Sequence, residues 1–149
     1  MNNTPQVKAP WLKSKDPEVP ATLTYSELSM CSRVEEMVRR YPDYIAYEFM
    51  GKCTTYAEMW KKINACAKSL KAIGIREGDK VTICMPNAPQ TLCMFYAVNM
   101  VGAIANMVHP LSAESEIAFY LRDSGSVAAI TLDQFYNKFE SVRKAVDLP

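Results

Sequence analysis

The residues that could carry chemistry in this sequence are few, and two of them follow predicted strands. Asn87 comes after the apolar run Val81–Met85, and His109 comes after the run Ala103–Val108. Ligands of open parallel sheets bind beyond the carboxyl ends of the strands, so both side chains are candidates for substrate contact. A structural interpretation stands beside this one, in which Asn87 caps the following helix and His109 only turns the chain before a proline.

No catalytic arrangement of residues is recognisable, and we predict no catalytic, cofactor-binding or metal-binding residue in this chain. His109 is the only histidine, and the five glycines are too far apart to form a phosphate-binding loop. A thiol nucleophile at Cys84 or Cys93, with His109 as its base, is an alternative. The methionine-rich run is typical of core packing; its members are Met85, Met94, Met100 and Met107.

Charge and composition narrow the classes of partner. The chain has 149 residues, with 17 basic against 16 acidic side chains, and 49% of its residues are hydrophobic. This balance leaves no basic surface for a phosphate backbone, so nucleic acid is not an expected partner. The hydrophobic content predicts a folded domain with a core of its own.

Cysteine usage and the N-terminus indicate the compartment. The five cysteines are odd in number and do not have the spacing of a metal site or a redox pair; they are Cys31, Cys53, Cys66, Cys84 and Cys93. We expect buried, reduced thiols. The polar, proline-rich start lacks the features of a secretory signal. We therefore predict a cytoplasmic protein.

One stretch is long enough to cross a bilayer, because no Asp, Glu, Lys or Arg occurs from Val81 to Ala113. Prolines and amides such as Pro86, Asn99 and Asn106 interrupt it, and each buried amide would lack a partner in lipid. We therefore predict no transmembrane span, and instead a strand, a buried helix and a second strand in a protein core.

The predicted organisation is an irregular arm over residues 1–28, followed by an α/β unit over residues 29–149. Four prolines disfavour regular helix in the arm, where Trp11 and Leu12 offer a possible docking point. Apolar spacing predicts a helix over 29–41, and alternation predicts a strand over 44–49 before a turn at Gly51-Lys52.

The clearest local signal is the capping box of Thr55 and Glu58, which predicts a helix that continues to a glycine stop at Gly74. Trp60 lies on its apolar stripe, so we expect this residue to hold the helix against the sheet, and Trp60→Ala to cost about 3–5 kcal/mol.

Strands then alternate with helices. After the strand at 81–85, the run 89–101 predicts a helix that is apolar on nearly all sides and must lie between two layers. Ser112 is the expected cap of a further helix, and 127–131 is a third strand before a final helix at 134–146. Such alternation predicts a doubly wound α/β fold, with a mainly parallel sheet and helices on both faces.

These elements in their order resemble the AMP-forming acyl-CoA synthetase family. The resemblance rests on Tyr41-Pro42-Asp43, Thr55-Tyr56-Ala57-Glu58-Met59, Gly78-Asp79-Lys80-Val81, Met85-Pro86-Asn87, Gly102-Ala103-Ile104 and His109-Pro110, and runs from about Trp11 to the C-terminus. Many members have Asn where this chain has His109. The arm, with Trp11 and Val19-Pro20, is more similar to medium- and long-chain fatty acid ligases than to luciferases.

The resemblance implies an acid–thiol ligase, in which a carboxylic acid reacts with ATP to give an acyl-adenylate and pyrophosphate, and CoA then takes the acyl group. It implies ATP, Mg²⁺ and CoA as cofactors of the full-length enzyme, the rest of the synthetase as partner, and a small carboxylic acid as substrate. In the family, the phosphate loop, the nucleotide contacts and the catalytic lysine lie beyond the matched stretch. We therefore expect this 149-residue piece to be inactive alone and to bind none of these cofactors.

Two other functional hypotheses remain open from the residues alone. One is a stand-alone interaction or regulatory module that keeps the fold without the chemistry, and the other is a small ligand-binding domain. We also expect the isolated chain to form a homo-oligomer, because the helix at 89–101 is apolar all round and a sheet edge would be uncovered.

Overall fold

Three parallel strands form the centre of the computed structural model, which describes residues 9–146. They are β3 (Lys80–Cys84), β4 (Ile104–Met107) and β5 (Ala128–Thr131). The order across the sheet is β4-β3-β5, and β3 pairs in parallel with both neighbours. The predicted parallel sheet is confirmed.

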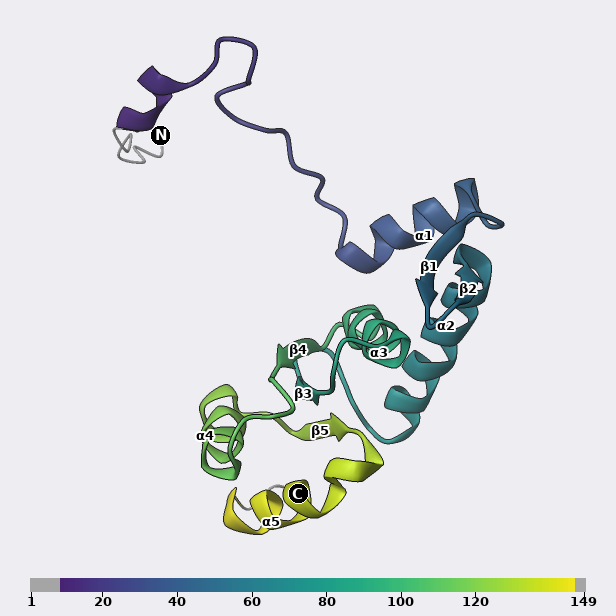
Figure 1. The fold of residues 1–149 in the computed structure, drawn as a ribbon, viewed down its shortest axis with the longest axis vertical. Coiled ribbons are helices and arrows are strands. Elements are labelled where there is room, and N and C mark those ends of the chain that lie inside the picture. Colours follow the sequence, from purple (N-terminus) through teal and green to yellow (C-terminus); the bar gives the residue numbers. More distant parts are fainter. Residues whose placement is uncertain (1–8, 147–149) are drawn as a thin grey trace.

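Helices cover both faces of this sheet (Figure 1). On one face lies α3 (Pro89–Met100), and Ile83 of β3 belongs to the same core as its buried side chains. On the other face lie α4 (Glu114–Ser124) and α5 (Tyr136–Val146), which share a second core with Cys84. Alternate residues of a strand point to opposite faces, so β3 contributes to both cores. The doubly wound α/β architecture is as predicted.

The helix α2 (Tyr56–Ala72) begins at the predicted capping box. The Thr55 hydroxyl oxygen accepts a hydrogen bond from the Glu58 amide at 3.3 Å, and the Glu58 carboxylate accepts one from the Thr55 amide at 3.0 Å. The bond from the Thr55 amide is the main reason why the pKa of Glu58 lies below its ordinary value.

The expected place of Trp60 against the sheet is wrong. The main neighbours of α2 are α3 and α1 (Met30–Arg40), and it is α3 that packs on the sheet. Trp60 is half-buried and lies beside residues of α1 and α3. Its ring therefore fills a junction between helices. Asn99 of α3 strengthens the same junction, because its side-chain oxygen accepts a hydrogen bond from the Cys31 amide at 3.0 Å.

The helix α3 lies between two layers, as its all-round apolar surface predicts. The sheet is on one side, and α2 with α1 is on the other. Its central residues Cys93, Ala97 and Val98 are buried. Together with β3 and β4, this helix accounts for the charge-free stretch Val81–Ala113. No helix within residues 9–146 combines the length and the apolar character that crossing a membrane requires.

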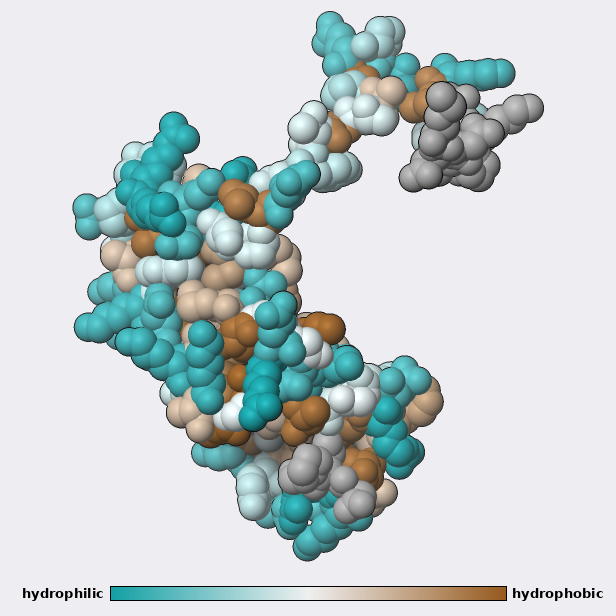
Figure 2. Space-filling model, turned by 180° about the vertical axis from the view of Figure 1, so that it is seen from behind, coloured by the Kyte–Doolittle hydropathy of each residue, from teal (hydrophilic) through white to brown (hydrophobic). Residues whose placement is uncertain are grey.

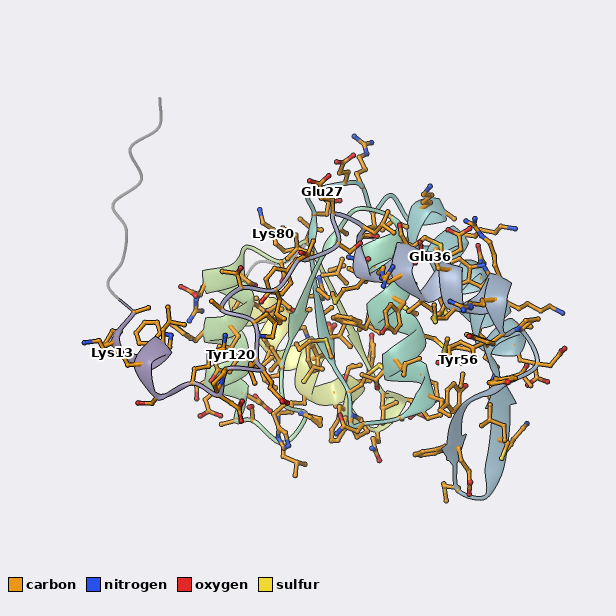
Figure 3. All side chains as sticks on the ribbon, turned by 90° about the horizontal axis from the view of Figure 1, so that it is seen from above. Lys13, Glu27, Glu36, Tyr56, Lys80 and Tyr120 are labelled. Atoms are coloured by element: carbon orange, nitrogen blue, oxygen red, sulfur yellow. The ribbon has the colours of Figure 1, made fainter. Side chains whose placement is uncertain are left out.

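A separate antiparallel hairpin precedes α2. Its strands are β1 (Ile45–Phe49) and β2 (Lys52–Thr55), joined by a turn in which Met50 and Gly51 both have positive φ. The turn therefore lies one residue earlier than the predicted Gly51-Lys52. The hairpin projects from the rest of the unit beside Tyr56, the first residue of α2 (Figure 3).

The N-terminal arm and two helix starts complete the fold. Between residues 9 and 28, the arm contains one 3₁₀ turn, η1 (Pro10–Ser14), which lies apart from the α/β unit (Figure 1). A short 3₁₀ turn, η2 (Asp133–Phe135), comes before α5.

The predicted cap at Ser112 is wrong by one residue, because Ala113 is the N-cap of α4 and its amide bonds to the Glu116 carboxylate at 2.9 Å.

The cysteines are only partly buried. Cys31, Cys84 and Cys93 lie in the core, Cys66 is half-buried and Cys53 is exposed. The expectation of burial is therefore wrong for Cys53, because it lies on the hairpin strand β2, outside the sheet and helix layers.

Candidate functional site

The two predicted site residues lie on one cleft at the carboxyl edge of the sheet. This His109 cleft has a volume of about 550 Å³, and Asn87 and Met107 are also in its wall. The parallel strands β3 and β4 place both residues there, because strands that run the same way end at the same edge. The structure thus brings the two candidates together.

The contacts of His109 are those of a residue that turns the chain. Its Nδ1 accepts a hydrogen bond from the Leu111 amide at 3.3 Å, and its side chain is exposed. A neutral imidazole that accepts at Nδ1 carries its proton on Nε2. The ring therefore has one N–H that can donate to a ligand in the cleft.

Asn87 does not cap the following helix. The N-cap of α3 is Ala88, and no side chain caps that end. In the first turn, the Thr91 hydroxyl instead donates to the Pro86 carbonyl at 2.6 Å. The structural interpretation is therefore wrong for Asn87, whose exposed amide lines the cleft as a potential ligand contact.

The alternative of a thiol nucleophile is not supported by the geometry. Cys84 is fully buried, and its sulfur donates to the main-chain carbonyl of His109 at 3.6 Å, not to the ring. Burial raises the pKa of this thiol, an effect that Lys138 only partly offsets. Cys93 belongs to the other core, away from His109. Neither pair is arranged for catalysis.

Two further clefts adjoin the first. The hairpin cleft, of about 430 Å³, lies between β1 and the start of α3, and shares Asn87 and Met107 with the His109 cleft. The sulfur cleft, of about 530 Å³, lies between α2, α3 and the end of β5, and shares Met85 with it. Hydrophobic side chains also reach the surface over the middle of the molecule (Figure 2). The carboxyl end of β3 is thus surrounded by apolar hollows.

Several residues of these walls were not predicted from the sequence as part of the site. Gln134 and Phe135 line the His109 cleft, and Leu132 lines the sulfur cleft. They follow the third strand, so the argument that selected Asn87 and His109 also applies to them. The exposed Met107, 49% accessible, is likewise a wall residue and not the core residue that was expected.

The chemistry of these walls suits apolar groups far better than phosphates. Lys62 and Glu48 are the only Lys, Arg, Asp or Glu side chains that line the three clefts. No glycine lines them. Within residues 9–146, no three His, Cys, Asp or Glu side chains are grouped so that they could hold a metal ion. A triphosphate with its magnesium ion would need several cations and a backbone cradle, so these residues do not fit it.

The fold and its clefts thus define an α/β unit with a mainly apolar carboxyl edge. A family model described as AMP-binding enzyme matches residues 34–148, and the chain belongs to this family. It is 32% identical over 133 residues to the long-chain-fatty-acid–CoA ligase of Bacillus subtilis, a match over 89% of this chain and 24% of that protein. It is 37% identical over 95 residues to the long-chain-fatty-acid–CoA ligase FadD13 of Mycobacterium tuberculosis, a match over 64% of this chain and 19% of that protein.

Comparison with solved structures also shows a similarity to this family. An inhibitor-bound crystal structure of the N-terminal domain of FACL13 from Mycobacterium tuberculosis matches with a TM-score of 0.75 and 31% identity. The match covers 81% of this chain and 31% of that domain. The chain therefore spans about a quarter of the length of its curated relatives and about a third of that solved domain.

Proposed function

We propose that this chain is the N-terminal part of an ATP-dependent acyl-CoA ligase that acts on fatty acids. The reaction joins a carboxylic acid to CoA, consumes ATP, and releases AMP and pyrophosphate by way of an acyl-adenylate. The observation that carries the proposal is the apolar carboxyl edge of the sheet, in a chain 32% identical to a long-chain-fatty-acid–CoA ligase over 133 residues.

The residues described here would supply scaffold and apolar wall. ATP provides AMP as the leaving group that makes the carboxylate reactive, and Mg²⁺ offsets phosphate charge. Because the three clefts contain one lysine and no glycine, we assign ATP, Mg²⁺ and CoA binding to other parts of the enzyme. Asn87 and His109 would touch the substrate at the strand ends.

The proposed organisation follows from the same comparison. Residues 1–28 would form an arm, and residues 29–149 an incomplete part of a larger AMP-binding domain, in agreement with a family match that begins at residue 34. The five cysteines, none of them in a disulfide, favour a cytoplasmic location.

We further propose that the isolated chain associates with a second copy through β4. Ile104 and Val108 bond through their amides to Asp79 and Ile83, so the main-chain groups of Ala105 and Met107 face the open side of the sheet. Ile104 and Met107 are 53% and 49% exposed. This edge lacks the charged residues that discourage strand pairing, and two copies could join it about a two-fold axis.

A chimaera tests the enzymatic proposal. The matching segment of the Bacillus subtilis ligase is replaced by this chain, and fatty-acid-dependent exchange of pyrophosphate into ATP is measured. We expect activity from the chimaera and none from the 149-residue chain alone. A folded but inactive chimaera would instead favour an interaction module, and exchange by the pure chain would show that phosphate chemistry resides in these residues.

Variants of the chimaera test the strand-end candidates. Asn87→Ala and His109→Ala should each lower kcat/KM for the fatty acid if these side chains touch the substrate. Asn64→Ala is the matched control, because the Asn64 amide bonds to the Trp60 carbonyl within α2 and lies outside the three clefts. Unchanged kinetics in the first two variants would remove both residues from the site.

A further inference from the structure

Four sulfur-bearing side chains line the sulfur cleft. Cys66 comes from α2, Cys93 and Met94 come from α3, and Met85 follows β3. Met85 and Cys93 are 8% and 4% exposed, and Cys66 and Met94 are half-buried. Residues from three segments of the chain thus bring two thiols and two thioethers to one hollow.

The two thiols lie on neighbouring helices that share the sulfur cleft. The helices α2 and α3 pack side by side, and Cys66 lies against the core that contains Cys93. Burial raises the pKa of Cys93, the Cys66 thiolate raises it further, and Lys62 lowers it in part. Both side chains line the sulfur cleft, so the packing of α2 on α3 brings the two thiols to one hollow.

We propose that the sulfur cleft binds a soft monovalent cation of the Cu(I) class through Cys66 and Cys93, with the Met85 and Met94 thioethers beside it. Thiolate and thioether ligands select Cu(I), whereas Mg²⁺ and Ca²⁺ need oxygen ligands. The two thiols bind as thiolates: Cu⁺ and two R–SH give Cu(SR)₂⁻ and two H⁺, and the oxidation state of copper does not change. A bound metal lowers the pKa of a coordinating thiol, so burial does not prevent this step.

Charge balance supports this ligand. Two thiolates and one monovalent cation carry a net charge of −1, which an apolar cleft would not tolerate alone. Lys62 is the only side chain of this cleft that carries a full charge at neutral pH, and its exposed ammonium group donates to the Tyr47 hydroxyl at 3.3 Å. The complex with Lys62 is therefore neutral.

The other cysteines do not have this arrangement. Cys31 and Cys84 are buried in different places, and Cys53 is exposed on the hairpin. None of the three lines the sulfur cleft. They therefore serve as internal controls.

The test measures Cu(I) binding by the reduced, purified 149-residue chain, in competition with a chromogenic Cu(I) chelator. We expect one tightly bound ion per chain, and loss of this ion in Cys66→Ser and in Cys93→Ala. Cys53→Ser, which removes an exposed thiol, should retain it. Met85→Leu and Met94→Leu keep the side-chain volume and should weaken binding by about tenfold. Equal binding by Cys66→Ser and the unchanged chain would overturn the proposal.

A second readout tests the thiol pair without a metal. Phenylarsine oxide condenses with two neighbouring thiols, so that R–As=O and two R–SH give R–As(SR)₂ and water. Intact-mass measurement should show one adduct, absent in Cys66→Ser and present in Cys84→Ser, with the fold of each variant checked by circular dichroism. No adduct on the folded, reduced chain would show that the two sulfurs are too far apart, and the proposal would fail. Neither readout depends on acyl-CoA ligase activity.

Discussion

The hydroxyl oxygen of Thr82 lies 2.7 Å from that of Ser126, and this contact joins the central strand to the loop after α4. The Asn106 amide donates to Thr82 at 2.9 Å, Ser126 and Ser124 are 2.8 Å apart, and Ser124 donates to the Leu121 carbonyl. Each hydroxyl has one proton, so the direction of the chain is determined: Asn106 to Thr82, then Ser126, Ser124 and Leu121. The network holds β4, β3 and α4 together on the α4–α5 side.

Thr82→Val tests this network. The change keeps the shape of the side chain but removes the donor to the buried Ser126 hydroxyl and the acceptor of the Asn106 amide, so we expect a loss of about 2 kcal/mol in the free energy of unfolding. Urea denaturation gives the value. Ser69→Ala removes an exposed hydroxyl that bonds only within α2, and should change stability by less than about 0.5 kcal/mol. Equal effects of the two changes would contradict a structural role for the network.

Substitutions at Trp60 and at Ile63 compare how much two contacts of α2 contribute to the free energy of unfolding. Ile63 is fully buried, and Ile63→Ala should cost about 3–4 kcal/mol in denaturation experiments. Trp60 is half-buried at the α1–α3 junction, so Trp60→Ala should cost only about 1–2 kcal/mol. A larger loss of stability for Trp60→Ala than for Ile63→Ala would instead support the contact with the sheet that the sequence predicted.

The capping box predicts a pH dependence. Hydrogen bonding by the Thr55 amide holds the pKa of Glu58 below its ordinary value. A carboxyl whose pKa is lowered on folding adds stability above its unfolded pKa of about 4.3, and this stability is lost as the pH falls through the folded pKa. Glu58→Gln should therefore lower the melting temperature at pH 7, and its difference from the unchanged chain should shrink as the solution is acidified below the unfolded pKa. A difference that persists undiminished in acid would contradict this origin.

The β4 edge predicts self-association. Sedimentation equilibrium of the isolated chain should give a mass above the monomer mass of 16.8 kDa. Met107→Lys places a charge at the open edge and should restore the monomer. Met50→Lys is the matched control, because Met50 is 91% exposed in the hairpin turn, and it should associate like the unchanged chain. A monomer mass for the unchanged chain would contradict the proposed association through β4.

Local signals in the sequence determined most of the elements. Thr55 and Glu58 are three residues apart, so their capping bonds form within one helical turn and do not need the rest of the fold. The strands at 81–85 and 103–108 and the helix between them follow from apolar runs and from Pro89 and Gly102. Alternation of such elements leads to a parallel sheet, whose carboxyl edge then holds Asn87 and His109.

Tertiary packing decided the partners of these elements. Periodicity shows that α2 has an apolar face, but the face could pack on a sheet or on a helix, and only the position of α3 selects the second. Cys66 and Cys93 share a cleft for the same reason, although 27 residues separate them in the sequence. Long-range contacts of this kind depend on how whole layers stack, and residue spacing along the chain carries no information about that stacking.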